Sequence, residues 1–163
     1  MAVPRLTAER PLIVLDPRRL DLAPRRAASI SGAARVGRPA GVDELGPVEL
    51  VVCGSVAVNR QGARVGKGGG YSDLGFGLLA EAGLLAKDAV LVTTVHPLQL
   101  VRRALPETAH DFRLDLIVAV DRVIRCRRGR RPPGILWDHL DQAKIASIPS
   151  LAALAAGNTA TSP

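Results

Sequence analysis

A glycine-rich run from Arg64 to Asp73 is the part of the sequence whose residue types and spacing best suit chemistry. It reads Arg-Val-Gly-Lys-Gly-Gly-Gly-Tyr-Ser-Asp, with four glycines among the five residues 66–70. Glycines let backbone N–H groups approach a polyanion closely, and a following helix N-terminus adds partial positive charge. Arg64 and Lys67 would add full charges to the same phosphates. The run predicts a phosphate-binding loop; the alternative is a flexible surface loop that happens to carry basic residues.

Two familiar phosphate-binding patterns do not fit this run. The Walker A pattern cannot be laid over these residues, and the dinucleotide pattern G-x-G-x-x-G fails at Tyr71. Cys53 and Cys126 lie far apart, without the spacing of a zinc site or a disulfide framework. The sequence therefore favours phosphate binding by a loop of another type.

The elements around the run place it between a strand and a helix. Residues 49–58 are apolar and β-branched on both faces, which is typical of a central parallel strand. Asp73 suits the N-cap of a helix that runs to about Leu85, because apolar residues recur there at helical spacing. The loop is thus expected to lead directly into a helix N-terminus.

The rest of the chain predicts short strands, helices and loops. Further strands are expected at 12–15, 89–95 and 114–120, with 123–125 as an extension or edge pairing, and helices at about 98–104 and within 137–148. Residues 18–47 are rich in Arg, Ala, Gly and Pro, so we expect loop there with at most a short helix. Residues 157–163 are expected to form a disordered tail.

The composition favours a single α/β domain over residues 1–156. The 163 residues suffice for one core, and 47% of them are hydrophobic although only 2% are aromatic. Aliphatic strands that alternate with helices predict a sheet covered by helices on both faces.

Several segments, in order along the chain, resemble the 5-formyltetrahydrofolate cyclo-ligase family. The run at 64–73 resembles the family's basic glycine loop, which leads into Tyr-Tyr-Asp; here the triplet is Tyr-Ser-Asp. Residues 51–58, 92–100 and 107–117 resemble the strand before the loop, the next strand and turn, and the closing segment. The match covers roughly 48–126. Residues 134–137 and 148–149 extend it to about 151 in the methenyltetrahydrofolate synthetase domain-containing branch.

This resemblance implies a fold, a reaction and a set of site residues. The fold would be a three-layer, mostly parallel sheet of the sugar-phosphate isomerase/CoA-transferase-like type. The reaction would be the ATP- and Mg²⁺-dependent conversion of 5-formyltetrahydrofolate, a reduced folate, to 5,10-methenyltetrahydrofolate. Arg64 and Lys67 would neutralise charge during phosphoryl transfer, Asp73 and Asp111 would bind Mg²⁺, and Tyr71 would face the folate. The residues implied to cradle ATP are Arg64, Gly66, Lys67, Gly68, Gly69, Gly70 and Tyr71.

Two departures from the family pattern bear on activity. Family members begin with a helical region that carries a Lys-x-x-x-Arg pattern, whereas this chain begins close to its first expected strand. Ser72 also stands where the family has a second tyrosine. Three interpretations follow: a truncated gene product, a site completed by another chain or by a homo-oligomer, or a protein that binds its ligands without turnover.

Each site residue also has a structural interpretation. Asp73 would serve as an N-cap only, Asp111 as an ordinary turn residue, and Tyr71 as a side chain that packs the loop onto the sheet. His96, which precedes a proline at a strand end, is expected to make a structural hydrogen bond.

The charge distribution leaves one further hypothesis open. The net charge is +7, and five arginines gather within residues 125–131. This cluster would suit nucleic-acid phosphates, but no aromatic residues interleave it, so a solvated basic loop is favoured. No apolar stretch reaches the roughly 20 residues of a membrane span, and no signal-like N-terminus is present, so we expect a cytoplasmic protein.

Overall fold

The computed structural model describes residues 1–159, which divide into two compact units where the sequence predicts a single domain over 1–156. Unit 1 comprises residues 1–45 together with the C-terminal segment from residue 137, and unit 2 comprises residues 46–136. The glycine loop and both expected magnesium carboxylates belong to unit 2.

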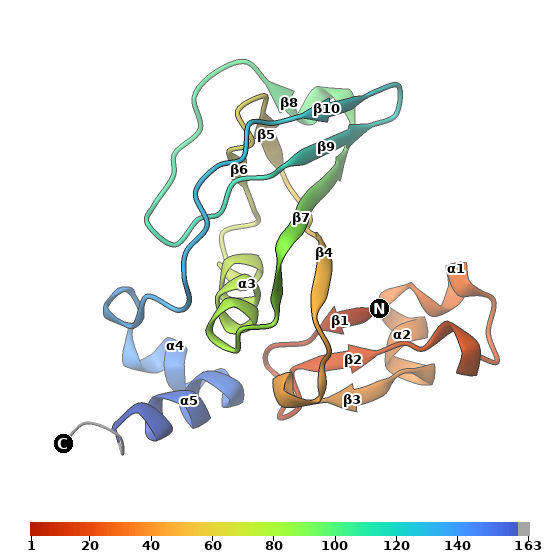
Figure 1. The fold of residues 1–163 in the computed structure, drawn as a ribbon, viewed down its shortest axis with the longest axis vertical. Helices are drawn as coiled ribbons and strands as arrows, with labels where there is room; N and C mark the ends of the chain where they lie inside the picture. The colour runs from red at the N-terminus through yellow and green to blue at the C-terminus, as the bar shows by residue number, and fades with distance from the viewer. Residues whose placement is uncertain (160–163) are drawn as a thin grey trace. The chain divides into compact units, whose positions relative to one another are not determined.

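Unit 1 is built on a small antiparallel sheet (Figure 1). Its strands are β1 (Ala2–Pro4), β2 (Leu12–Val14) and β3 (Arg38–Ala40), in that order. Two short helices, α1 (Pro24–Ala27) and α2 (Ile30–Val36), lie between β2 and β3, and the C-terminal segment forms α4 (Gln142–Ala146) and α5 (Pro149–Thr159). The expected strand at 12–15 is confirmed, but residues 18–47 contain more regular structure than expected.

Unit 2 contains a mostly parallel sheet, as the sequence predicts, but α3 is the only α-helix within residues 46–136, so helices on both faces of the sheet are not seen within this unit. The strand order is β10 (Val123–Arg125), β9 (Leu116–Ala119), β7 (Leu85–Val95) and β4 (Val48–Val52). The β4–β7 and β7–β9 pairs are parallel, and β9–β10 is an antiparallel hairpin. A second, three-stranded sheet is formed by β6 (Arg64–Val65), β5 (Ala57–Asn59) and β8 (Leu100–Val101). The fold is therefore mixed α/β.

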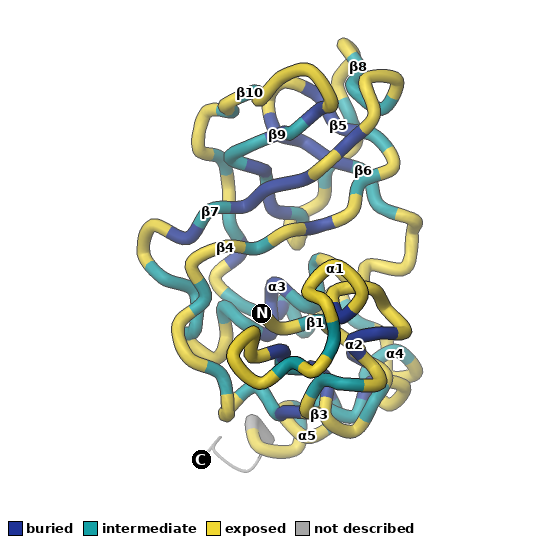
Figure 2. The backbone as a smooth tube through the Cα atoms, turned by 90° about the vertical axis from the view of Figure 1, so that its right-hand side faces the viewer, coloured by how far each residue is buried: buried dark blue, intermediate teal, exposed yellow. Residues whose placement is uncertain are grey.

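The core of unit 2 lies between the sheet and α3 (Tyr71–Glu81), which runs beside β7 (Figure 1). Leu91 of β7 and Ile117 of β9 are fully buried in this core and belong to the same hydrophobic cluster as Phe76 of α3. Burial of each such side chain is worth about 1.5–3 kcal/mol. Figure 2 shows the buried stretches of β7 and α3 in dark blue.

Three local expectations are wrong. The strand expected over 49–58 is broken into β4 and β5, and β4 is an edge strand on which Leu50 and Val52 are 56% and 63% exposed. The helix expected at 98–104 is a 3₁₀ turn, Pro97–Gln99, followed by β8. The helix expected to reach Leu85 ends at Glu81, because Gly83 adopts a positive φ of 65° and Leu85 begins β7.

The C-terminal expectations are met in part. Helix α4 falls within the expected range 137–148, after a 3₁₀ turn at Trp137–His139. The disordered tail was expected to start at residue 157, but residues 157–159 belong to α5. Residues 160–163 lie outside the described part of the chain.

Candidate functional site

The glycine loop, residues 66–70, connects β6 to the first turn of α3. Gly68 and Gly70 have φ values of 91° and 68°, a region that favours glycine over residues with a Cβ. A Cβ added at either position would meet no atom within 4 Å, so conformation and not crowding requires glycine there. The loop therefore presents its backbone on an open surface, as close contact with a polyanion requires.

Helix α3 begins at the loop but is not capped as the sequence suggests. Its N-cap is Gly70, in the left-handed region, and no side chain caps it. Asp73 lies in the first turn, where its negative charge is favourable to the helix dipole. The prediction that Asp73 is the N-cap is therefore wrong, and its carboxylate is directed to another partner.

That partner is Arg64. Its Nη2 donates to Asp73 Oδ1 over 2.5 Å, and the two side chains are only 2% and 13% exposed. The Arg64 guanidinium also lies over the ring of Phe112, 4.4 Å from the ring centroid, as a cation–π contact. Phe112 in turn packs against Phe76 with ring centroids 4.7 Å apart. Arg64 thus joins the loop base to the hydrophobic core.

This position bears on the expected role of Arg64 as a phosphate ligand. The guanidinium lies beneath the loop, because a Cβ on Gly66 would be 3.4 Å from Arg64 Nη1. Its Nε is buried and has no hydrogen-bond partner among the described residues. In this arrangement the partner of the Arg64 guanidinium is the Asp73 carboxylate. Direct contact of Arg64 with a phosphate stays a prediction.

Asp73 and Asp111 lie within electrostatic range of each other. Burial raises the pKa of Asp73, Arg64 lowers it, and the negative charge of Asp111 raises it again. The negative charge of Asp111 therefore reaches Asp73, although burial and Arg64 have the larger influence on the pKa of Asp73. Joint binding of Mg²⁺ by the two carboxylates stays a prediction.

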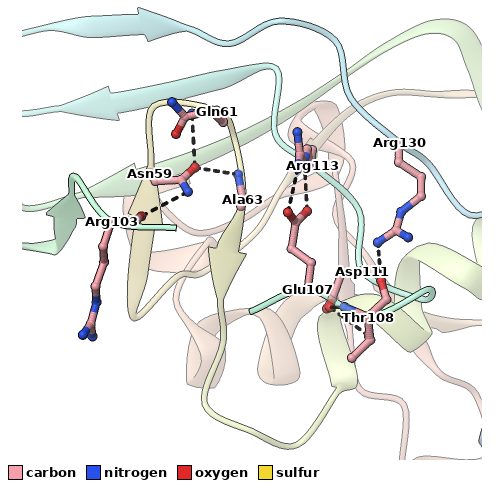
Figure 3. A network of polar contacts seen from close by, with 9 residues as sticks. All are labelled: Asn59, Gln61, Ala63, Arg103, Glu107, Thr108, Asp111, Arg113 and Arg130. Carbon is pink, nitrogen blue, oxygen red and sulfur yellow. Dashed lines mark hydrogen bonds and ion pairs between the residues drawn. The ribbon is translucent and has the colours of Figure 1, made fainter. Parts of the chain in front are cut away.

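Asp111 is held by a tight turn, which Figure 3 shows. Its Oδ2 accepts hydrogen bonds from the backbone N–H of Thr108 at 2.5 Å and from Thr108 Oγ1 at 2.8 Å. Arg130 donates to the carbonyl oxygen of the same threonine. The interpretation of Asp111 as a turn residue is therefore correct, and it does not exclude a role in metal binding.

The site fits magnesium only together with a phosphate ligand. Within residues 1–159, no group of three or more His, Cys, Asp or Glu side chains could hold a metal ion. Mg²⁺ is commonly held by one or two carboxylates together with substrate phosphates and water. Asp73 and Asp111 would supply that protein share, and a nucleotide on the adjacent loop would supply the remaining oxygens.

Lys67 and Tyr71 occupy the exposed side of the loop. Lys67 is exposed within it, so its ammonium is available to a bound anion. The ring of Tyr71 lies against Gly69, since a Cβ there would be 2.9 Å from Tyr71 Cδ2, and 48% of the tyrosine remains exposed. Tyr71 thus packs against the loop itself, its packing onto the sheet stays a prediction, and enough of its surface is exposed to contact a ligand.

A separate hollow lies at the carboxyl ends of β7 and β9. It has a volume of about 350 Å³, and its lining includes Thr94, His96, Gln99 and Val120. His96 Nδ1 accepts from the backbone N–H of Leu98 at 3.3 Å, which is the structural hydrogen bond expected for it. The lining contains no residue of the glycine loop.

The arginine cluster at 125–131 is largely engaged within the protein. Arg128 and Arg131 donate to the carbonyl oxygens of Lys87 and Ala89 at 2.7 and 2.8 Å, and Arg130 donates to Thr108. Arg131 also pairs with Asp115 at 2.5 Å. Three of the five arginines therefore bind other parts of unit 2, which leaves fewer N–H donors for nucleic-acid phosphates.

Sequence reasoning missed three residues that support the site: Phe112, Thr108 and Arg130. The aromatic scarcity of the chain could have singled out Phe112, one of only two phenylalanines. Thr108 precedes Asp111 by three residues, a spacing at which an aspartate can accept hydrogen bonds within a turn. Nothing in the sequence points to Arg130, because its partner is 22 residues away.

Comparisons with known proteins agree on one family. Residues 14–120 match the model of the 5-formyltetrahydrofolate cyclo-ligase family. Proteins named methenyltetrahydrofolate synthase domain-containing protein are similar: that of Homo sapiens is 38% identical over 137 residues, and that of Danio rerio is 34% identical over 131. These alignments cover 81% and 78% of this chain but 35% and 34% of the relatives, so the chain spans about a third of their length.

Among solved structures, the chain is similar to the NMR structure of Aquifex aeolicus 5,10-methenyltetrahydrofolate synthetase. The identity is 24% and the TM-score 0.47, with 85% of this chain and 64% of that chain covered. In residues 1–159, no helix combines the length and the apolar character needed to cross a membrane.

Proposed function

This chain belongs to the 5-formyltetrahydrofolate cyclo-ligase family, and we propose that its unit 2 binds ATP and Mg²⁺ and converts 5-formyltetrahydrofolate to 5,10-methenyltetrahydrofolate. The observation that carries the proposal is the open glycine loop: Gly68 and Gly70 take positive φ values with free space around them, and the loop leads into the first turn of α3, which contains Asp73. The charge of Asp111 acts on Asp73, so the two carboxylates lie within electrostatic range of each other. This combination would suit nucleotide phosphates bound together with a metal ion.

The proposed chemistry makes the formyl oxygen a leaving group. The γ-phosphoryl group of ATP is transferred to that oxygen, which leaves ADP. N10 of the folate then bonds to the formyl carbon and releases its proton to solvent, and the carbon–oxygen bond breaks so that phosphate leaves with the former formyl oxygen. The protein's task is to position the phosphates and neutralise their charge. Lys67 and the backbone N–H groups of residues 66–70 would do this from the loop. Asp73 and Asp111 would hold Mg²⁺, and Tyr71 would face the folate.

Turnover with a matched lysine control tests this proposal. Purified protein should form ADP only when both 5-formyltetrahydrofolate and Mg²⁺ are present, and Lys67→Ala should reduce the rate at least about tenfold. Lys87→Ala is the matched control, because Lys87 is also exposed but lies in β7 outside the site. Folded protein without folate-dependent ADP formation would refute catalysis.

A second candidate is a module that binds nucleotide or folate without turnover. The observation that favours it is the Arg64–Asp73 pair, which withholds one of the two cations predicted to act on the phosphates. Calorimetry separates the candidates: this module binds ATP–Mg²⁺ or folate but forms no ADP. Binding of neither ligand would contradict both candidates.

The remaining details of the proposal concern fold and partners. We retain the three-layer, isomerase/CoA-transferase-like arrangement over 1–156 as a prediction, together with a site completed by another chain or by a second copy. Cytoplasmic location likewise stays a prediction. Nucleic-acid binding through 125–131 is less favoured, because Arg128, Arg130 and Arg131 already bind protein oxygens.

A further inference from the structure

The turn that carries Asp111 is held by two arginines that the proposed reaction does not use. Arg113 makes a bidentate pair with Glu107, with Nε and Nη2 at 2.8 and 2.7 Å from the two carboxylate oxygens. Arg130 donates to the carbonyl oxygen of Thr108. Figure 3 shows both contacts on the residues that precede Asp111.

The hydrogen bonds to Asp111 separate the roles of its two carboxylate oxygens. Thr108 donates twice to Oδ2, from its backbone N–H and from its hydroxyl. No hydrogen bond or ion pair to Oδ1 is found within the described part of the chain. A carboxylate with one oxygen fixed by donors and the other available is a common arrangement for a metal ligand.

The backbone places Arg130 beside this turn. The N–H of Arg113 donates to the carbonyl oxygen of Arg130 at 3.1 Å, so the two chain segments run alongside each other. Gly129 permits this approach, because a Cβ there would lie 2.6 Å from both Cβ and Cδ of Arg113. The pKa of Glu107 lies below its ordinary value mainly because Glu107 accepts a hydrogen bond from Arg113. The positive charge of Arg130 lowers this pKa further by a smaller amount.

We propose that Arg130 is a positioning residue: through Thr108 it fixes the turn that holds Asp111 by Oδ2, which leaves Oδ1 for the metal ion that Asp111 would bind. This inference rests on the proposed function, because it concerns the same metal–nucleotide site. It gives part of the arginine segment 125–131 a role in organising that site.

The sign of the effect distinguishes positioning from simple charge. Removal of a nearby positive charge should strengthen cation binding by Coulomb's law. Removal of a group that orients a metal ligand should weaken it, typically by 10- to 100-fold for such outer partners. Arg130→Ala therefore weakens Mg²⁺ binding if positioning dominates and strengthens it if only charge matters.

The experiment titrates Mg²⁺ into the full chain with a bound non-hydrolysable ATP analogue, followed by calorimetry. Arg130→Ala should weaken the apparent Mg²⁺ affinity about tenfold. Arg130→Lys, which keeps a donor and the charge, should recover part of this loss. The matched control is Arg127→Ala, since Arg127 is exposed in the same segment and should change the affinity less than about twofold.

A parallel titration of the analogue in EDTA excludes a direct phosphate contact. Positioning predicts equal metal-free nucleotide affinity for wild type and Arg130→Ala, and an equal loss with and without metal would overturn it. An Mg²⁺ affinity for Arg130→Ala that matches Arg127→Ala or exceeds wild type would also overturn it. If Arg130→Ala does not fold, Arg130→Met decides instead: it keeps an aliphatic stem but removes the donor to the Thr108 carbonyl oxygen, and it should weaken Mg²⁺ binding. An unchanged Mg²⁺ affinity in Arg130→Met would overturn the proposal.

Failure of this inference is distinguishable from failure of the proposed function. Wild-type nucleotide binding that responds to Mg²⁺, and that loses the response in Asp73→Asn, supports the metal–nucleotide site whatever Arg130→Ala does. A wild type whose nucleotide binding is indifferent to Mg²⁺ overturns the site and the inference together.

Discussion

Replacement of Arg64 by methionine should destabilise the protein by about 3–5 kcal/mol, because it leaves the nearly buried Asp73 carboxylate without its counterion. Methionine fills much of the volume of the arginine stem, so the loss is mainly electrostatic. The contact between the guanidinium and the Phe112 ring is lost as well, which adds about 1–2 kcal/mol for a desolvated cation–π pair.

The loss should depend on pH with a definite sign. Burial already raises the pKa of Asp73, and Arg64 is the main opposing influence, so the variant's folded-state pKa rises further. A carboxyl whose folded pKa lies above its unfolded value gains folding stability as pH falls through the folded pKa. The deficit of Arg64→Met relative to wild type should therefore be full at neutral pH and shrink on acidification.

A double-mutant cycle isolates the pair. Asp73→Asn alone leaves the Arg64 cation buried without its partner, whereas Arg64→Met/Asp73→Asn removes both charges. The double variant should be more stable than the sum of the single losses predicts, by about 2–3 kcal/mol. Urea denaturation followed by far-ultraviolet circular dichroism measures each free energy of unfolding.

The outcome that refutes this reasoning is additivity within about 0.5 kcal/mol, the agreement expected of independent sites. A cycle on the exposed Arg122–Asp121 pair provides the control, because its side chains are 55% and 49% exposed. That pair should show no measurable coupling. A large coupling there would mean that the assay reports general charge effects.

Two further predictions concern the loop region. Gly62→Ala should destabilise the protein by about 3 kcal/mol, because Gly62 has a φ of 83° and a Cβ there would lie 2.5 Å from the Leu114 carbonyl oxygen. Gly68→Ala, with a φ of 91° but open space, should cost only about 1 kcal/mol; equal urea midpoints for the two variants would contradict the clash. As the pH falls, the Mg²⁺ affinity of the nucleotide complex should begin to drop at a higher pH than it would with an ordinary aspartate ligand, because burial raises the pKa of Asp73 and a metal ligand must be deprotonated. Calorimetric titrations at a series of decreasing pH values measure this affinity. An affinity that stays constant down to the pH at which an ordinary aspartate protonates would contradict the prediction.

The sequence predicted the parts of the fold that depend on local pattern. Continuous apolar runs located β7 and β9, and the cluster of glycines located the break between β6 and α3. The same patterns could not show that β4 lies at the sheet edge, because an apolar edge strand and an apolar central strand have the same hydrophobic pattern in the sequence. Strand order depends on contacts between distant segments, which periodicity does not record.

The site shows the same division between local and distant information. Asp73 and Asp111 were identified by resemblance, and the structure brings them within electrostatic range. The sequence predicted Asp73 as the N-cap because aspartate is a common capping residue. The N-cap is instead Gly70, which adopts a positive φ. The contact of Arg130 with Thr108 joins residues 22 apart, so no local pattern signals it.

The buried Arg64 is paired with Asp73 and so is not a free cation for the phosphates, but this position would still suit a metal site. A metal ligand must be ionised, and burial alone would favour the protonated form of Asp73. Arg64 offsets that cost by bonding Oδ1. Among residues 1–159 no hydrogen bond or ion pair to Oδ2 is found, so this oxygen would be open to a cation. Arg64 would thus keep Asp73 ionised, while Lys67 and the loop N–H groups contact the phosphates. Under this division of labour, Lys67→Ala weakens nucleotide binding with or without metal, whereas Arg64→Met weakens chiefly the response to Mg²⁺.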